Sequence, residues 1–181
     1  MIPIIRFNEF LLELQAEVNT LLSKYAFIFR NNMWVYTEDE DAIPGNDKGK
    51  QVDTIIISPT ESHLIKKIKE ATGIVLAVQL AQSDTEAESV DNYSENDNEL
   101  FFILEKVDPA QFTEQNEQYH YAKLQLVIKL VKEYILSRGM NGNMCGGDET
   151  ISKPFHTEWE YSIFGGFNGL SISFNLRNFN L

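Results

Sequence analysis

The sequence predicts an α+β fold, in which a mainly antiparallel sheet carries about three helices and ends in a C-terminal β-hairpin. The clearest observation is strict alternation of apolar and polar side chains from 155 to 163 and again from 170 to 177, on either side of Gly165–Gly169. The second observation is the order of the remaining patterns, which is helix, strands, helix, strands, helix. This order favours helices packed on one face of an antiparallel sheet.

Length and composition predict one globular domain. The chain has 181 residues, of which 43% are hydrophobic and 12% are aromatic, and a chain of this size buries roughly 70% of its unfolded surface. We expect a single α+β domain over 1–181, with acidic loop insertions near 38–50 and 83–99.

Charge and cysteine content exclude several classes of protein. A net charge of -12 with dispersed basic residues argues against sequence-specific nucleic-acid binding. The sequence predicts neither a membrane span nor a usual export signal at Met1–Arg6. A single cysteine, Cys145, excludes an internal disulfide framework and a cysteine-built zinc site, and it fits a reducing cytoplasm.

The first part of the chain predicts an amphipathic helix and a hairpin. Apolar residues recur at three- and four-residue steps from Phe10 to Tyr25, and Asn8 is the expected N-cap. Two short apolar arms, 27–29 and 33–36, flank Asn31 and Asn32, which tolerate positive φ and so predict a tight turn. The acidic and glycine-rich residues that follow, 38–50, predict a loop.

A strand, a helix and a second strand are expected next. Val52 to Ile57 is β-branched, and Ser58–Glu61 offers an N-cap at Ser58, a proline at the first helical position and a glutamate three residues after the cap. Gly73 is expected to end the helix as a left-handed cap, before a strand over 74–79. The stretch 83–99 has seven acids and no Lys or Arg, which predicts a long solvated loop before the strand 100–104.

The longest helix is expected from Thr113 to Ser137, with Gly139 as its stop signal. One apolar stripe predicts its buried face: Tyr119, Leu124, Val127, Ile128, Val131, Tyr134 and Ile135. A glycine-rich loop over 139–148 then leads to the terminal hairpin.

Cys145 is the first residue we weigh as a catalytic group. Its glycine-rich surroundings, 143–148, would let a substrate approach the backbone. A nucleophilic cysteine also needs a base, however, and neither His120 nor His156 stands in a recognisable context. The sequence therefore favours no catalytic role for Cys145.

Metal sites are weighed in the same way. His63, His120 and His156 fall on two helices and a strand, without the spacing of a metal site, and we expect His156 to point to water. The acids Asp39–Asp41 and the 84–99 stretch lack a complete calcium-loop pattern and are interpreted as solvated charge.

Three further patterns have ordinary structural explanations. Glu158 and Glu160 share one strand face, and a glycosidase needs two carboxylates within about 5 to 10 Å of each other across a cleft, but an exposed polar face accounts for this pair. Gly165–Gly169 lacks the lysine of a phosphate loop and is interpreted as a hairpin turn. Lys66, Lys67 and Lys69 are interpreted as ordinary helix surface. We therefore predict no catalytic, cofactor-binding or metal-binding residue, no cofactor, and an interaction protein that is not an enzyme.

The C-terminal half resembles a family. The strand-turn-helix run from Phe101 to Asp108 into the helix around 119–135, followed by the hairpin 159–176, resembles the small neck proteins of tailed bacteriophages and prophages, the head-tail connector and tail-terminator group. The resemblance implies a homo-oligomeric ring in the virion, assembled in the host bacterial cytoplasm with other neck, portal or tail proteins. It carries over no individual site residue.

The charge and hairpins agree with a ring. An acidic lumen would repel DNA and let it slide, and the exposed edges of the two hairpins would supply a contact between unlike patches by strand addition. The alternatives are a cytoplasmic protein- or ligand-binding module and an enzyme that uses Cys145 with a histidine.

Overall fold

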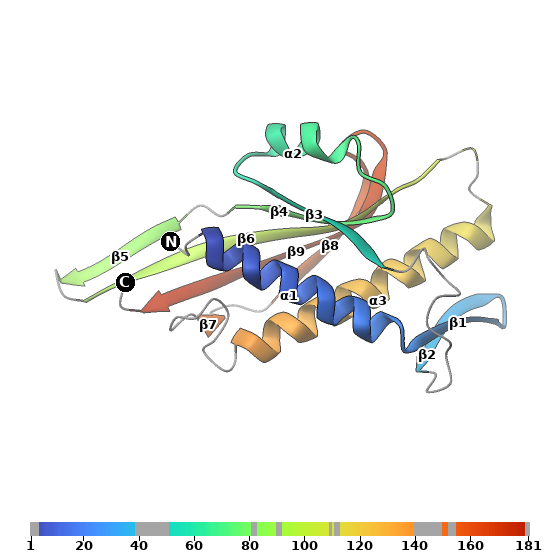
Figure 1. Cartoon of the computed structure of the whole chain (residues 1–181), viewed down its shortest axis with the longest axis horizontal. Coiled ribbons are helices and arrows are strands. Elements are labelled where there is room, and N and C mark those ends of the chain that lie inside the picture. Colours follow the sequence, from blue (N-terminus) through green and yellow to red (C-terminus); the bar gives the residue numbers. More distant parts are fainter. Residues whose placement is uncertain are drawn as a thin grey trace.

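The computed structural model of the chain describes residues 4–38, 51–80, 83–89, 92–108, 110, 113–139, 150–151 and 155–179. Its elements are the helices α1 (Ile4–Leu22), α2 (Glu61–Ile68) and α3 (Glu114–Gly139), and the strands β1 (Tyr25–Arg30), β2 (Met33–Glu38), β3 (Val52–Ser58), β4 (Ile74–Gln79), β5 (Ser83–Ser89), β6 (Asn92–Lys106), β7 (Thr150–Ile151), β8 (His156–Ile163) and β9 (Phe167–Phe179). The predicted α+β class is confirmed, with a mainly antiparallel sheet and a C-terminal hairpin (Figure 1).

One seven-stranded sheet forms the centre of the molecule. Its strands run in the order β3-β4-β6-β9, β5 pairs with β6, and both β7 and β8 pair with β9. Every pair in it is antiparallel except β3 with β4, which α2 connects as a crossover helix. The hairpin of β1 and β2 forms a separate two-stranded sheet, beside the ends of α1 and α3 in Figure 1.

Helices cover both faces of the central sheet, so the expectation that they share one face is wrong for α2. On β4, Ile74, Leu76 and Val78 face α1 and α3, whereas Val75 and Ala77 face α2. A strand that is apolar at every position is typical of burial on both sides. Figure 1 shows α2 on one side of the sheet and α1 and α3 on the other.

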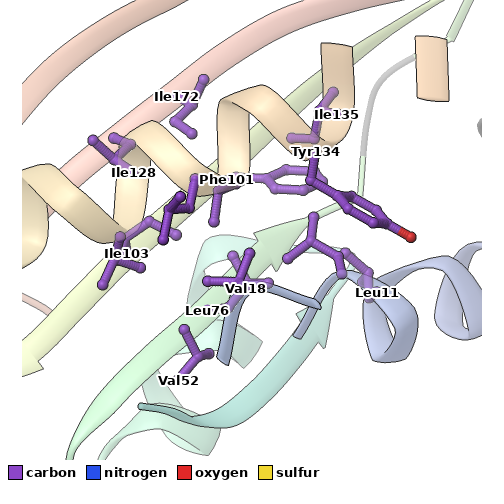
Figure 2. Packing of buried hydrophobic residues seen from close by; sticks show 14 of the residues in the cluster. Leu11, Val18, Val52, Leu76, Phe101, Ile103, Ile128, Tyr134, Ile135 and Ile172 are labelled. Atoms are coloured by element: carbon purple, nitrogen blue, oxygen red, sulfur yellow. The ribbon is translucent and has the colours of Figure 1, made fainter. Parts of the chain in front are cut away.

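The larger apolar cluster lies between the sheet and the pair α1 and α3 (Figure 2). Leu11 and Val18 of α1, Leu76 of β4 and Phe101 and Ile103 of β6 are buried there with no exposed area. The ring of Phe101 also contacts Phe7 and Phe174, with centroids 6.2 and 5.3 Å away. The cluster thus fixes both helices on the sheet.

Three helix-end predictions need correction. Helix α1 already includes Ile4, so Asn8 lies inside it, because Phe7 is buried and extends the apolar stripe one turn earlier. The N-cap of α2 is Thr60, whose hydroxyl accepts a hydrogen bond from the His63 amide at 3.4 Å; Ser58 is the buried last residue of β3. Helix α2 ends at Ile68, and Gly73, with φ of 71°, leads into β4 instead.

Within the acidic stretch 83–99, the described residues 83–89 and 92–99 are strand rather than loop. Strand β5 pairs with the first part of β6, and the end of β9 pairs with the same part of β6 from the other side. The ladder hydrogen bonds come from main-chain groups, so an acidic segment can extend a sheet that an apolar core has already set in register. The predicted loops at 38–50 and 139–148 lie outside the described residues, except for Glu38 at the end of β2 and Gly139 at the end of α3.

The two predicted hairpins are confirmed. Asn31 and Asn32 have φ of 51° and 61°, as a two-residue turn with both central residues left-handed requires. In the C-terminal hairpin, the register shifts between Glu160 and Ile163. This bulge moves Ile163 to the α2 side of the sheet, whereas Trp159 packs on the α3 side. The strict alternation predicted through Ile163 therefore ends before it.

Candidate functional site

Three charged or titratable side chains meet between β6 and α3. Glu105 follows Phe101 and Ile103 at alternate positions of β6, so it faces α3 as they do. His120 and Lys123 lie one turn apart on α3 and face the sheet. One carboxylate oxygen of Glu105 lies 2.7 Å from Nδ1 of His120, and the other accepts a hydrogen bond of 2.6 Å from Nζ of Lys123. We call Glu105, His120 and Lys123 the buried triad.

Burial and charge act in opposite directions on Glu105. Burial by itself would raise its pKa, but the hydrogen bond from His120 and the charge and hydrogen bond of Lys123 outweigh it and hold the pKa below the ordinary value of 4.5. His120 and Lys123 are themselves buried, with 5% and 6% of their area exposed. The carboxylate is therefore ionised and paired at neutral pH.

The residue types of the buried triad occur in acid-base catalysis, yet their position favours a structural role. Removing one partner of a buried ion pair leaves the other charge buried and unpaired, which is costly. The three side chains are therefore stable only when α3 lies at one place on β6. Sequence reasoning considered His120 alone. The available signal was a glutamate at an inward position of an apolar strand, together with a lysine beside the apolar stripe of α3.

The structure separates the other histidines. His63 is exposed on α2 and His156 is exposed on β8, as the sequence predicts for His156. Nε2 of His156 lies 2.7 Å from a carboxylate oxygen of Glu158 on the same strand face. Among the residues that the structure describes, no three His, Cys, Asp or Glu side chains gather as metal ligands.

Glu158 and Glu160 share the polar face of β8 but differ in their surroundings. The carboxylate of Glu160 accepts a hydrogen bond of 2.7 Å from the Ser171 hydroxyl of β9, whereas the side chain of Glu158 is 64% exposed. Cys145 and Asp39–Asp41 lie outside the described residues. The described residues of the 84–99 stretch belong to β5 and β6, as given above.

Loops at one end of the sheet enclose a groove of about 550 Å³. Its walls come from the α2–β4 loop at Gly73, the end of β6 at Lys106 and Asp108, and the β8–β9 turn at Gly165 and Gly166. The predicted lysine surface is exposed, since Lys66 and Lys67 are exposed on α2 and Lys69 is exposed at its C-cap. None of the buried triad residues lines this groove.

Large apolar side chains are exposed at a few places. Three of the seven in the described part of the chain belong to the β1–β2 hairpin, and one belongs to β8. They are Phe29 (40%), Met33 (60%) and Val35 (40%) on the hairpin and Tyr161 (59%) on β8, besides Ile5, Leu12 and Leu136 on the helices. Exposed apolar residues in groups are typical of protein contacts.

An aromatic row leads from α3 to the exposed side chain of β8. The ring of Tyr121 lies 5.0 Å from that of Trp159, and Trp159 lies 6.4 Å from Tyr161. The Tyr121 hydroxyl donates a hydrogen bond of 2.6 Å to Glu117, and burial together with that carboxylate raises the pKa of Tyr121 to about 12. These rings support β8 from the α3 side.

Within the described part of the chain, no helix is long and apolar enough to cross a membrane. Comparison with known proteins gives no match, neither to a protein-family model nor to a curated protein.

Proposed function

We propose that this chain is a structural protein of the neck of a tailed-phage or prophage virion, a subunit of a homo-oligomeric ring of the head-tail connector or tail-terminator type, without enzymatic activity. The observation that carries the proposal is that large apolar side chains are exposed at two unlike places, three on the β1–β2 hairpin and one, Tyr161, on β8. A closed ring needs a heterologous contact, in which one patch meets a different patch on the next copy.

The overall charge also supports this proposal. A chain of net charge -12 repels a DNA duplex, so a ring of such chains lets DNA pass without holding it. The partners expected above and below the ring are other neck, portal or tail proteins, in a virion assembled in the host bacterial cytoplasm. No sequence-specific contact to DNA is part of this function.

The first test is the absolute mass of the purified protein, measured by light scattering over a range of protein and salt concentrations. We expect a defined species of several subunits, and electron microscopy of that species should show closed rings with a central channel. A strictly monomeric particle that also fails to bind any purified portal or tail component would contradict the proposal.

The groove at the end of the sheet favours one other function, that of a cytoplasmic ligand- or protein-binding module. Its opening is formed by three loops and carries the charges of Lys106 and Asp108, a common arrangement for a binding site. A monomer that binds a metabolite or peptide, and loses the binding in Lys106→Ala, would favour this module over the ring. Lys66→Ala, on α2, is the matched control.

A further inference from the structure

We propose that the tip of the β1–β2 hairpin of one copy docks on the outer edge of β8 of the next copy, with Arg30 facing Glu158. This inference rests on the ring proposed above and names its subunit contact. The partner is a second copy of this chain. The argument uses the two edges of the central sheet, the charges of its strands and the exposed side chains of the hairpin.

The β3 edge of the sheet is occupied by the chain itself. The side-chain amide of Asn19 pairs with Val52 as a neighbouring strand would, since its Oδ1 accepts from the Val52 amide at 2.8 Å and its Nδ2 donates to the Val52 carbonyl at 3.1 Å. Gln15 donates to the same carbonyl at 2.8 Å, and Nζ of Lys67 donates to the carbonyl of Ile57 at 2.7 Å. Side chains thus cover main-chain groups that a partner strand would need.

The β8 edge lacks such a cover from the described part of the chain. Strand β8 pairs with β9 on one side, and no other described strand pairs with it. Its side chains include Tyr161, exposed to 59%, and Glu158, exposed to 64%. An open edge with an exposed aromatic side chain is suited to strand addition or to a hairpin laid along it.

Charge excludes two possible occupants of this edge. A second β8 would bring Glu158 and Glu160 against the same acids, and like charges across an interface oppose binding. The sequence of β5 has three acidic residues and no basic one, so its charge has the same sign as that of β8. The contact is therefore between unlike strands, as a ring requires.

The tip of the β1–β2 hairpin has the complementary charge. Arg30 lies beside the turn, whereas the one acid of the hairpin, Glu38, lies at the other end of the strand pair, opposite Tyr25. Arg30 is exposed beside the turn, next to Phe29 and Met33, which are 40% and 60% exposed. Docked on β8, these side chains would bring a cation to Glu158 and an apolar surface to Tyr161.

The hairpin is already held in one position on its own subunit. Nε1 of Trp34 donates a hydrogen bond of 3.0 Å to the carbonyl of Gln115 on α3, and the Trp34 ring lies 4.9 Å from that of Tyr119. In Figure 1 the hairpin stands outside the central sheet, at the opposite end of the molecule from β5. A preformed arm loses little conformational entropy on docking.

A charge exchange tests the contact. We expect Arg30→Glu alone and Glu158→Arg alone to raise the dissociation constant of the assembly ~10-fold or more, because each places like charges in contact. The double variant should restore it to within about three-fold, since the pair is re-formed with its signs exchanged. Lys66→Glu makes the same change of charge on α2 and should leave assembly unchanged. Light scattering measures assembly, and circular dichroism checks that each variant is folded.

Cross-linking gives an independent measurement. In a Cys145→Ser chain, Arg30→Cys and Glu158→Cys are prepared separately, and oxidation should yield covalent dimers when the two are mixed, but few when either is alone. If the protein assembles but Arg30→Glu leaves its mass unchanged, or if the mixture gives no more dimer than the separate proteins, the hairpin-to-β8 contact is wrong while the ring remains. A chain that is monomeric at every concentration and forms no cross-link overturns both.

Discussion

Glu105 is the single residue that most clearly determines how α3 packs on β6. It follows the apolar Phe101 and Ile103 on the inward face of β6, and His120 and Lys123 of α3 stabilise it there. A buried carboxylate without these partners would be costly. The side chains therefore specify which part of α3 lies against the end of β6.

We predict that Glu105→Gln destabilises the fold by about 3–5 kcal/mol, because it leaves the Lys123 ammonium buried without its counter-charge. Urea denaturation followed by circular dichroism measures the change. Glu133→Gln is the control: Glu133 is an exposed carboxylate on the same helix, 3.9 Å from Lys129, and it should change stability by less than about 0.5 kcal/mol. Equal effects of the two substitutions would contradict the role of Glu105 as the counter-charge of Lys123.

The ion pair of Glu105 and Lys123 also predicts that the free energy of unfolding depends on pH. The pKa of Glu105 is lower in the folded protein than its ordinary value of 4.5, so its contribution is fully present above that value and disappears as the pH falls through the folded-state pKa. The difference in unfolding free energy between the natural protein and Glu105→Gln should be constant near neutral pH and shrink below pH 4.5. Denaturant titrations at a series of pH values measure it, and a constant difference down to pH 2 would show that Glu105 is not the titrating group.

Among the elements, the β1–β2 hairpin depends most on its turn. Asn31 and Asn32 both have positive φ, a conformation that asparagine tolerates and β-branched residues do not. The turn brings Phe27 and Trp34 onto Tyr119 of α3. Turn and helix together position the surface that the ring proposal uses.

We expect Asn32→Val to destabilise the protein by about 1–2 kcal/mol, the cost of a left-handed conformation for a residue branched at Cβ. Thermal unfolding measures the loss. Thr37→Val, at an exposed position of β2, is the matched control and should have little effect, because valine suits an extended strand. A turn without positive φ would tolerate both substitutions equally.

In the molecule as a whole, an apolar cluster lies on each face of the central sheet. The larger one joins α1 and α3 to one face, and the smaller one joins α2 to the other. Glycine at 169 lets β9 approach β6 closely, since a Cβ there would lie 2.0 Å from the carbonyl oxygen of Ile103. Because the larger cluster joins α1 to the sheet, we expect the free energy of unfolding to depend on the buried side chains of α1.

Leu14→Ala should cost about 2–5 kcal/mol, because Leu14 has no exposed area and its truncation leaves a cavity in the larger cluster. Leu12→Ala is the control on the same helix; Leu12 is 52% exposed and should change stability by less than about 0.5 kcal/mol. Chemical denaturation measures both. Similar losses would mean that α1 does not contact the sheet through Leu14.

Most local elements could be predicted from the amino-acid sequence alone. Periodicity located the strands at 52–57 and 74–79, the long helix from 113 and the C-terminal hairpin, and the Asn31–Asn32 pair located the first turn. These features are encoded by neighbouring residues: alternation, helical spacing and the φ preferences of single side chains. From the sequence we also predict no catalytic or metal-binding residue, and this stays a prediction.

Which surfaces meet depends on the tertiary structure. The described acidic residues 83–89 and 92–99 form strand because β5 and β9 flank β6 there. Thr60 caps α2 in place of Ser58, and α2 lies across the sheet from α1 and α3. Glu105, His120 and Lys123 come together, and Asn19 closes the β3 edge, through contacts between residues far apart in the chain. Such contacts depend on long-range packing and on the main-chain ladder, which the local pattern of side chains does not encode.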